Sequence, residues 1–249
     1  MKKILYLLVF SFLFIGINEV KASTYYTNTK GVDFTKEQYD FITDMYYDGY
    51  QDVMSKADLD KLVSKNIIGK PISKYTLDSS GIINDNPINT RSTSVYYAGR
   101  RLTIGVSCDN DCLITLTAKW EGTPTVQSWD VIGFRTYNMT GIDPNAASVV
   151  GTGYSATYFP NNTQFRQLTN GWGYSVKLGN ANNLKISTSM YANIGGTAYG
   201  SYQHAGTAVT LATSKLYTIS IGGYGSVFAF YGAAAGQYDG APGVYKNIA

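Results

Sequence analysis

The sequence predicts a mainly β protein, an antiparallel β-sandwich or jelly-roll-like domain with a small N-terminal α-helical appendage. Three observations predict this fold. Apolar residues alternate with a period of two from residue 96 onward, tyrosine and glycine are abundant (22 and 26 residues), and no helical pattern separates the alternating runs. Tyrosine tolerates half-burial on a pleated sheet and glycine supplies turns, so we expect short strands joined by tight connections.

The N-terminal residues, 1–22, have the pattern of a secretory signal peptide. Lys2 and Lys3 precede an apolar run over residues 4–15, and residues 20–22 (Val-Lys-Ala) supply a small-x-small cleavage site. The run is too short for a comfortable membrane span, and no later run approaches spanning length. We therefore expect a secreted, extracellular protein with no transmembrane segment in its mature chain.

Charge and residue usage exclude several classes of function. Removal of the peptide would lower the formal net charge from +3 to +1, so no basic surplus remains to bind nucleic acid. His204 is the only histidine, which excludes a multi-histidine metal site. No glycine-rich phosphate loop carries the required lysine. We therefore expect neither a metal nor a cofactor.

Residues 23–69 are predicted to form two short helices. Thr35 with Gln38, and Ser55 with Asp58, have the spacing of capping boxes. Helices this short cannot bury enough surface to be stable alone. We expect them to pack on the larger domain or on each other.

The remaining chain divides into a linker and the β-domain. Residues 70–95 are rich in Ser, Asn, Thr and Asp with little periodicity, which predicts a linker or a loosely attached extended segment. Residues 96–249 form the β-sandwich domain, with a hairpin from 102–106 and 114–120 and a central strand over 129–137. Further strand patterns cover 172–178, 184–190, 207–212, 215–221 and 226–231.

Both cysteines lie in one short motif, Cys108-Asp-Asn-Asp-Cys112. In an exported chain, two cysteines this close most simply form a local disulfide, here clamping the turn of the hairpin. The alternative is a metal or redox site with Asp109 and Asp111 as oxygen ligands. Two thiolates without histidine partners suit zinc poorly, and redox motifs usually separate their cysteines by two residues, so we expect the disulfide.

Catalysis needs convergent groups, and the spacing of the carboxylates in the β-domain favours no pair. Asp130 stands out because it lies inside a strong strand pattern, where it would be an edge-face carboxylate or a partner of Arg135. The catalytic alternative is a secreted hydrolase of polysaccharide that uses Asp130 with Glu121 or Asp239.

The abundant aromatic residues offer a surface for binding. A sandwich core absorbs only part of them, and exposed rings stack on sugars or anchor protein contacts. The alternative is that the rings fill the core and its rims. The candidate binding residues are Tyr154, Tyr158, Trp172, Tyr199, Tyr202 and His204.

Two sets of motifs resemble a loose group of secreted proteins of Gram-positive bacteria that have no assigned activity. The motifs lie at 31–39, 54–55, 115–120, 128–135, 199–204 and 238–244. The resemblance implies secretion and a β-rich C-terminal region, and it assigns no catalytic residue.

The leading hypothesis is a secreted, non-catalytic protein that binds cell-wall or host glycan, or a cell-surface protein, through aromatic side chains. The hydrolase is the first alternative. The second is a membrane-active β-protein, because residues 186–213 are poor in charge and rich in Thr, Ser, Gly and Tyr, as a membrane-inserting hairpin can be. The glycines at 195–196 equally suit an ordinary turn.

Overall fold

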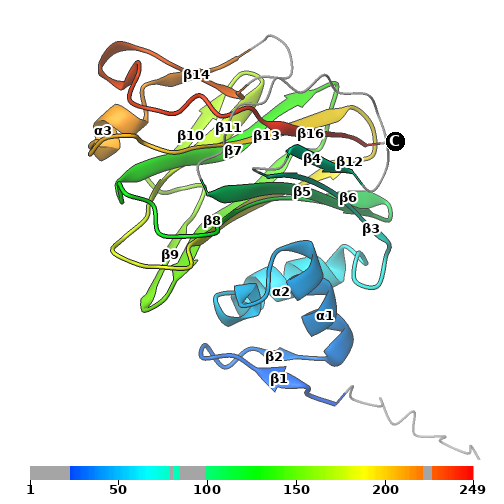
Figure 1. The fold of residues 1–249 in the computed structure, drawn as a ribbon. Helices are drawn as coiled ribbons and strands as arrows, with labels where there is room; N and C mark the ends of the chain where they lie inside the picture. The colour runs from blue at the N-terminus through cyan, green and yellow to red at the C-terminus, as the bar shows by residue number, and fades with distance from the viewer. Residues whose placement is uncertain (1–22, 79–80, 85–98, 221–225, 249) are drawn as a thin grey trace, which may run out of the picture.

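The structure, a computed structural model, describes residues 23–78, 81–84, 99–220 and 226–248. The expected signal peptide (1–22) and the second half of the predicted linker lie outside the described residues. Two β-sheets stack on each other, with a helical subdomain against one outer face and short C-terminal elements against the other (Figure 1). The predicted fold class, a β-sandwich with a small helical part, is confirmed.

The first layer is a seven-stranded antiparallel sheet in the order β4-β3-β5-β6-β12-β8-β9. Its strands are β3 (Ile72–Asp78), β4 (Gly81–Asn84), β5 (Arg100–Cys108), β6 (Asp111–Trp120), β8 (Asp143–Gly151), β9 (Tyr154–Tyr158) and β12 (Lys185–Asn193). The second layer is a five-stranded antiparallel sheet in the order β10-β11-β7-β13-β16. Its strands are β7 (Trp129–Tyr137), β10 (Phe165–Leu168), β11 (Gly171–Lys177), β13 (Thr197–Gln203) and β16 (Val244–Asn247).

Smaller elements cover the outer faces of both sheets (Figure 1). Residues 23–70, here called the N-terminal subdomain, lie against the seven-stranded sheet and contain β1 (Tyr26–Thr27), β2 (Asp33–Phe34), α1 (Lys36–Met45), the 3-10 helix η1 (Tyr50–Asp52) and α2 (Lys56–Ser64). The five-stranded sheet is covered by α3 (Leu211–Ser214), β14 (Tyr217–Ile219), β15 (Phe228–Phe230) and the 3-10 helix η2 (Gly232–Ala234).

Apolar alternation explains where the main core lies. Side chains on one face of each sheet meet between the layers, because successive residues of a strand point to opposite faces. On β6 these are Ile114, Leu116 and Ala118; Phe134 and Trp172 meet them from the other sheet, with ring centroids 5.2 Å apart. Two satellite cores lie under the N-terminal subdomain and under the C-terminal elements.

Most predicted strands are present. The hairpin over 102–120 is β5–β6, and β7 lies centrally between β11 and β13. The run at 207–212 is not a strand, because Thr210 caps α3 by accepting a hydrogen bond from the backbone N–H of Thr213.

Part of the segment predicted to be a linker or a loosely attached extended segment is paired into the sheet. Residues 72–78 form β3, which pairs antiparallel with β5, and residues 81–84 form β4, which pairs antiparallel with β3 at the edge of the seven-stranded sheet. The polar composition concealed four β-branched residues, Ile72, Thr76, Ile82 and Ile83, which favour extended backbone. Pairing also satisfies the backbone groups that β5 would otherwise expose at an edge.

Residues 186–213 do not form a hairpin. β12 belongs to the seven-stranded sheet and β13 to the five-stranded sheet, so the chain crosses between layers at residues 194–196. Gly195 and Gly196 have φ values of +115° and +80°, which side-chain-bearing residues rarely adopt. The hairpin on which the membrane-active alternative was based is therefore absent from residues 186–213, and Gly195 and Gly196 form an ordinary turn.

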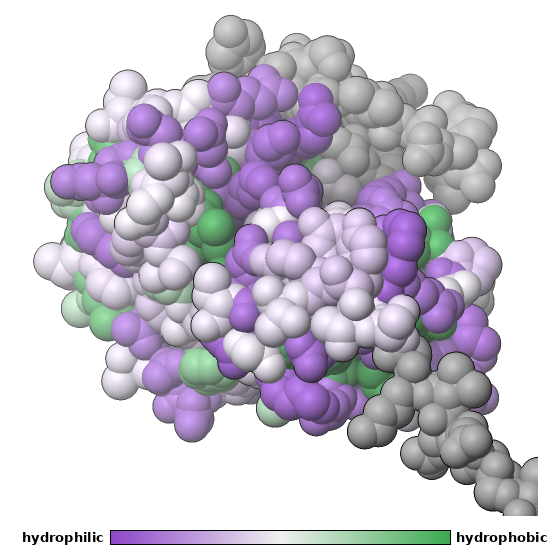
Figure 2. All heavy atoms as spheres, turned by 90° about the horizontal axis from the view of Figure 1, so that it is seen from below, coloured by the Kyte–Doolittle hydropathy of each residue, from purple (hydrophilic) through white to green (hydrophobic). Residues whose placement is uncertain are grey.

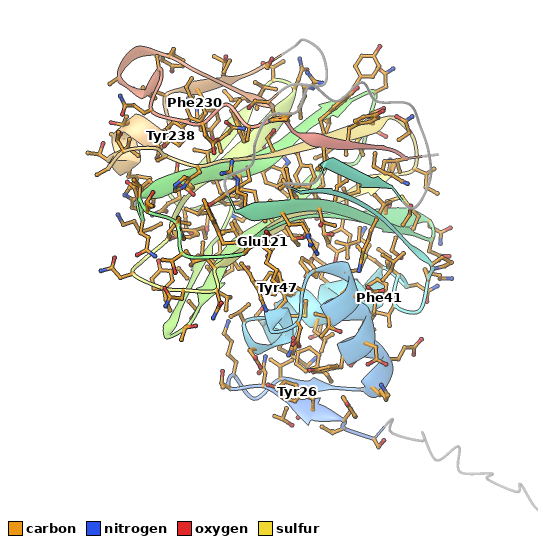
Figure 3. All side chains as sticks on the ribbon, viewed as in Figure 1. Tyr26, Phe41, Tyr47, Glu121, Phe230 and Tyr238 are labelled. Atoms are coloured by element: carbon orange, nitrogen blue, oxygen red, sulfur yellow. A yellow bond between two sulfur atoms is a disulfide. The ribbon has the colours of Figure 1, made fainter. Side chains whose placement is uncertain are left out.

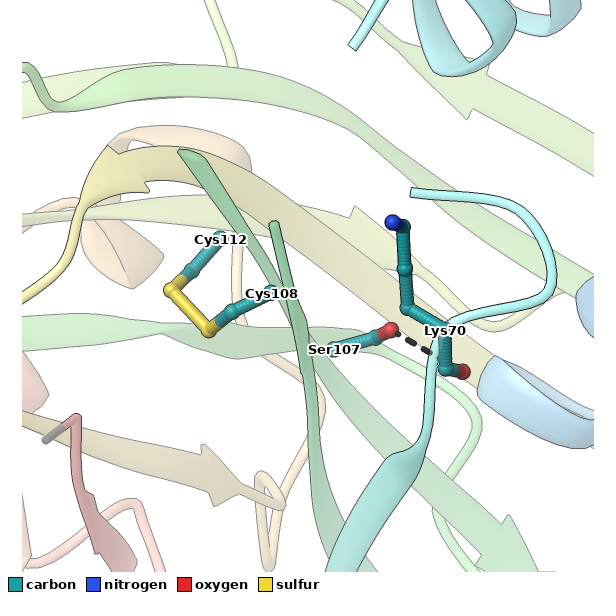
Figure 4. The surroundings of a disulfide bond; sticks show 4 residues. All are labelled: Lys70, Ser107, Cys108 and Cys112. Atoms are coloured by element: carbon teal, nitrogen blue, oxygen red, sulfur yellow. Dashed lines mark hydrogen bonds between the residues drawn. A yellow bond between two sulfur atoms is a disulfide. The ribbon is translucent and has the colours of Figure 1, made fainter. Parts of the chain in front are cut away.

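The predicted disulfide is present (Figure 4). Cys108 and Cys112 lie opposite each other at the end of the β5–β6 hairpin, with Cα atoms 4.0 Å apart. The neighbouring Ser107 donates a hydrogen bond to the carbonyl of Lys70, at the end of the N-terminal subdomain. The clamped turn therefore lies beside that subdomain.

Candidate functional site

Two capping boxes build the helices of the N-terminal subdomain. The Thr35 hydroxyl accepts from the backbone of Gln38, whose side chain accepts from the backbone of Thr35. Ser55 and Asp58 repeat this arrangement at α2. Each box satisfies N–H groups that a helix start leaves unpaired, so both predicted helix starts are confirmed.

The subdomain docks on a sheet face that is lined with hydroxyl groups. On β6 and β12 the outward-facing positions include Thr115 opposite Ser189 and Thr117 opposite Ser187, and Ser148 of β8 lies opposite Ser187. All five side chains are buried. We call this set the hydroxyl face. It is the polar counterpart of the apolar face on the other side of the same strands.

Tyrosines of the subdomain bind the hydroxyl face. The Tyr46 hydroxyl lies 2.9 Å from the Ser189 Oγ, and the Tyr47 hydroxyl lies 3.3 Å from the Ser148 Oγ. Figure 3 shows Tyr47 between the helices and the sheet. Thr115 donates to the carbonyl of Met45 at 2.9 Å. Burial raises the pKa of Tyr47 to about 12, so its hydroxyl stays protonated at neutral pH.

A pocket opens at this junction, between the N-terminal subdomain and strands β8 and β12. The rings of Tyr46 and Tyr50 are parallel, with centroids 3.9 Å apart, and Tyr191 lines the same pocket. Asp58, Lys61 and Asn145 supply polar groups, and Met54, Leu62 and Ala146 supply apolar ones. We call this site the tyrosine pocket.

The polar groups of the tyrosine pocket are held in place. Lys61 forms an ion pair with Asp143 at 2.6 Å and donates to the Asn145 side-chain carbonyl at 3.1 Å. The Asn145 amide donates to the Ser189 hydroxyl at 3.0 Å. Rings with a few positioned polar groups are the composition of a small-ligand site.

Lysine–aspartate pairs fasten the subdomain beside the pocket. Lys65 pairs with Asp111 at 2.6 Å and Lys70 pairs with Asp109 at 2.9 Å. Both aspartates belong to the disulfide loop, so the oxygens that the alternative metal site would use bind lysines instead. The Lys70 ammonium, with Asn66 second, lowers the pKa of Asp109 below its usual value.

Asp130 lies at the centre of a second polar cluster, inside the sandwich. It is fully buried, its carboxylate accepts from the Tyr202 hydroxyl and the Ala205 backbone N–H, and its Oδ2 lies 2.9 Å from the His204 Nδ1. The expectation of an edge-face carboxylate is wrong, because β7 is a central strand. The observed partners of Asp130 are Tyr202, His204 and the Ala205 backbone rather than the predicted Arg135. Arg135 instead lies over the Tyr199 ring at 4.0 Å.

Asp239 joins this cluster from the C-terminal segment. Its Oδ2 pairs with buried Arg100 at 2.5 Å and its Oδ1 accepts from the His204 backbone N–H at 3.3 Å. Asp130 and Asp239 therefore both contact His204, whereas Glu121 lies apart and pairs with Arg101 at 3.6 Å. The cluster ties the C-terminal segment to β7 and β13.

Most of the predicted binding residues lie in or against the core. Trp172 and Tyr202 are buried, so no ligand reaches their rings without rearrangement, and His204 and Tyr158 are nearly so. Tyr154 donates to the Lys177 carbonyl, and Tyr199 stacks on Tyr245 with centroids 5.7 Å apart. For these two half-buried rings, binding stays a prediction.

Sequence analysis missed the tyrosine pocket, which joins segments about 100 residues apart. A local signal was present, because Tyr46, Tyr47 and Tyr50 are concentrated at the end of a predicted helix. Nothing in the sequence shows that Asn145 and Tyr191 would meet them, since that depends on the order of β8 and β12 in the sheet.

The described parts of the chain contain no cluster of three or more His, Cys, Asp or Glu side chains that could hold a metal ion. None of the helices in those parts is long and apolar enough to cross a membrane. Figure 2 views the molecule from the side of the N-terminal subdomain, where hydrophobic residues show only as small patches among polar ones. Comparison with protein-family models, curated proteins and solved structures gave no match.

Proposed function

We propose that this protein is a secreted, non-catalytic binding protein that recognises an extracellular glycan at the tyrosine pocket. One observation carries the proposal: three tyrosine rings converge with an amide, a carboxylate and an ammonium group in one pocket. Sugars present apolar C–H faces that stack on aromatic rings and hydroxyls that bond to planar polar side chains.

The position of the pocket also supports binding. Tyr46 and Tyr50 come from the N-terminal subdomain, while Asn145 and Tyr191 come from the sheet. Hydrogen bonds to Ser189 fix the position of Tyr46 relative to Asn145. A site held rigid in this way loses little conformational entropy when it binds.

A substitution series on the secreted chain, residues 23–249, tests the proposal. We expect binding in a glycan array or a pull-down with insoluble cell wall, lost in Tyr50→Leu and kept in Tyr50→Phe, because stacking needs the ring and not the hydroxyl. Tyr231→Leu is the matched control, since Tyr231 is 43% exposed in the C-terminal region away from the pocket. No binding by the unaltered chain in either assay would falsify the proposal.

A polysaccharide hydrolase is the second candidate, and one observation favours it: Asp130 and Asp239 both contact His204. Glycosidases use two carboxylates on either side of the scissile bond. Against this, the Asp130 carboxylate is fully buried and already accepts several hydrogen bonds. Release of reducing sugar from cell-wall glycan, abolished in Asp239→Asn, would establish the hydrolase.

A further inference from the structure

The disulfide loop holds the end of α2 against the seven-stranded sheet. Its Asp111 carboxylate pairs with the Lys65 ammonium at 2.6 Å. Its Asp109 carboxylate pairs with Lys70 at 2.9 Å and accepts a hydrogen bond from the Asn66 amide at 3.1 Å. Lys65 is the C-terminal cap residue of α2, and the other two residues lie just after it. The loop therefore binds the segment in which the chain leaves the helix.

The same end of α2 reaches the tyrosine pocket. Lys61 and Leu62 of α2 line the pocket together with Tyr191 of β12. The Lys61 ammonium lies 4.9 Å from the centroid of the Tyr191 ring, and the Lys65 ammonium lies 5.8 Å from the same centroid. One side chain, Lys65, therefore joins Asp111 of the disulfide loop to a ring of the pocket.

The disulfide restricts the loop that carries both aspartates. Cys108 and Cys112 lie opposite each other at the ends of β5 and β6, and their sequence separation is 4. The covalent bond limits the conformations of the short segment between them. Without the bond the two carboxylates would lie on a longer and more mobile turn. Holding them in place for the ion pairs would then cost conformational entropy.

A thiol reductant can reach the disulfide at one of its two sulfurs. Cys112 is fully buried in the main core, whereas Cys108 is only partly buried at its edge. A dithiol therefore attacks the Cys108 Sγ, and the Cys112 Sγ leaves as a thiolate and takes up a proton. The second thiol of the reductant then displaces Cys108 from the mixed disulfide. The two cysteines gain two electrons and two protons, and the dithiol becomes a cyclic disulfide.

We infer that the redox state of the Cys108–Cys112 disulfide regulates the tyrosine pocket, an inference that rests on the proposed function. In the oxidised protein the loop holds α2 on the sheet and keeps the pocket assembled. In the reduced protein the ion pairs of Asp109 and Asp111 weaken, the end of α2 opens more often, and glycan affinity falls. Because both ion pairs are partly exposed, the expected loss of affinity is about threefold to fivefold.

Hydrogen exchange with and without dithiothreitol tests the coupling in the absence of any ligand. Alkylation and mass spectrometry show whether both cysteines of the secreted chain have been reduced. Exchange of the amides of residues 61–70 should then accelerate about threefold to fivefold, while exchange in β7 and β11 stays unchanged. The apparent affinity for insoluble cell wall, from a pull-down titration, should fall by about the same factor.

Two variants test whether the effect passes through the ion pairs of the loop. Asp109→Asn combined with Asp111→Asn keeps the disulfide and removes both negative charges. Its α2 amides should exchange faster even in the oxidised protein, and dithiothreitol should have no further effect. Asp44→Asn is the matched control, because Asp44 of α1 pairs with Lys74 of β3 and not with the loop. This control should respond to dithiothreitol as the unaltered chain does.

The outcomes separate this inference from the proposed function. Unchanged exchange in α2 after reduction would overturn the inference, and so would a disulfide that dithiothreitol does not reduce in the folded protein. Faster exchange with unchanged binding to cell wall would also overturn it and leave the proposed function standing. An undiminished response in the double variant would overturn the route through the ion pairs. If neither cell wall nor any glycan on the array is bound in either redox state, the proposed function fails as well.

Discussion

The two faces of the seven-stranded sheet are buried by different chemistry. The inner face of β6 and β12 carries Ile114, Leu116, Ile186 and Met190 and packs against the second sheet. The outer face of the same strands carries mainly hydroxyls and is covered by the N-terminal subdomain. Apolar burial is non-directional, whereas hydrogen bonds and ion pairs fix a position. The comparison teaches that the inner face holds the fold together and the outer face positions the tyrosine pocket.

A large cavity in the inner core should test this difference most strongly. Trp172→Ala removes a fully buried ring between the sheets, and we expect a loss of about 3–5 kcal/mol in the free energy of unfolding. Urea unfolding followed by fluorescence and by circular dichroism should give one shared transition at a lower midpoint. An unchanged urea midpoint in the circular dichroism signal of the β-sheets would show that the inner face is not the main source of stability.

Loss of one hydroxyl on the outer face should have a smaller and more local effect. Ser189→Ala leaves the Tyr46 hydroxyl and the Asn145 amide without their shared partner, at a cost of about 1–3 kcal/mol. Hydrogen exchange should accelerate in α1 and α2 and stay slow in β7 and β11. Uniform acceleration across both sheets would contradict the separation of roles.

Removal of a helix cap should be milder still. Thr35→Ala breaks the capping box of α1, and we expect a loss of about 1 kcal/mol. Thr35→Ser is the control because its hydroxyl can still cap the helix. Exchange rates of the first amides of α1 distinguish the two variants, and equal rates would show that the box contributes nothing.

The smallest expected effect concerns the ion pair of Asp109 with Lys70, whose contribution to stability depends on pH in the acid range. The pKa of Asp109 is lowered by Lys70, so its stabilising contribution is present above the unfolded pKa of about 3.9 and is lost as pH falls through the still lower folded value. Asp109→Asn should remove that part of the acid dependence. Hydrogen exchange of the α2 amides, measured at pH 5 and pH 3 in both proteins, tests this prediction. An unchanged pH dependence of protection in Asp109→Asn would show that the ion pair of Asp109 with Lys70 is not its source.

Strands with simple alternation were predictable from the sequence, as were the two capping boxes and the disulfide. In each case the signal is local: a period of two on β6, a hydroxyl three residues before its partner, or two cysteines across a turn. β3 was missed because serine and threonine conceal a strand whose pairing partner is β5. Composition is a poor predictor of a strand such as β3, whose conformation depends on pairing with a distant strand.

The candidate site was harder to predict. The abundance of aromatic residues predicts Trp172 and Tyr202 as binding residues, but both side chains are buried in the sandwich, as the alternative interpretation has it. Asp130 and His204 are paired through the order of strands β7 and β13, which no spacing rule reveals. The tyrosine pocket depends on a subdomain docking on a distant strand, and this information is absent from any local window.

The contact between Tyr46 and Ser189 spans 143 positions along the chain. During synthesis the ribosome produces α1 and α2 before β12, so the two helices have no docking face until β12 has been made. Contacts this distant in sequence form late, because closing a long loop costs entropy before any contact repays it. The N-terminal subdomain therefore docks late in folding, and the tyrosine pocket exists only after it has docked on the sheet.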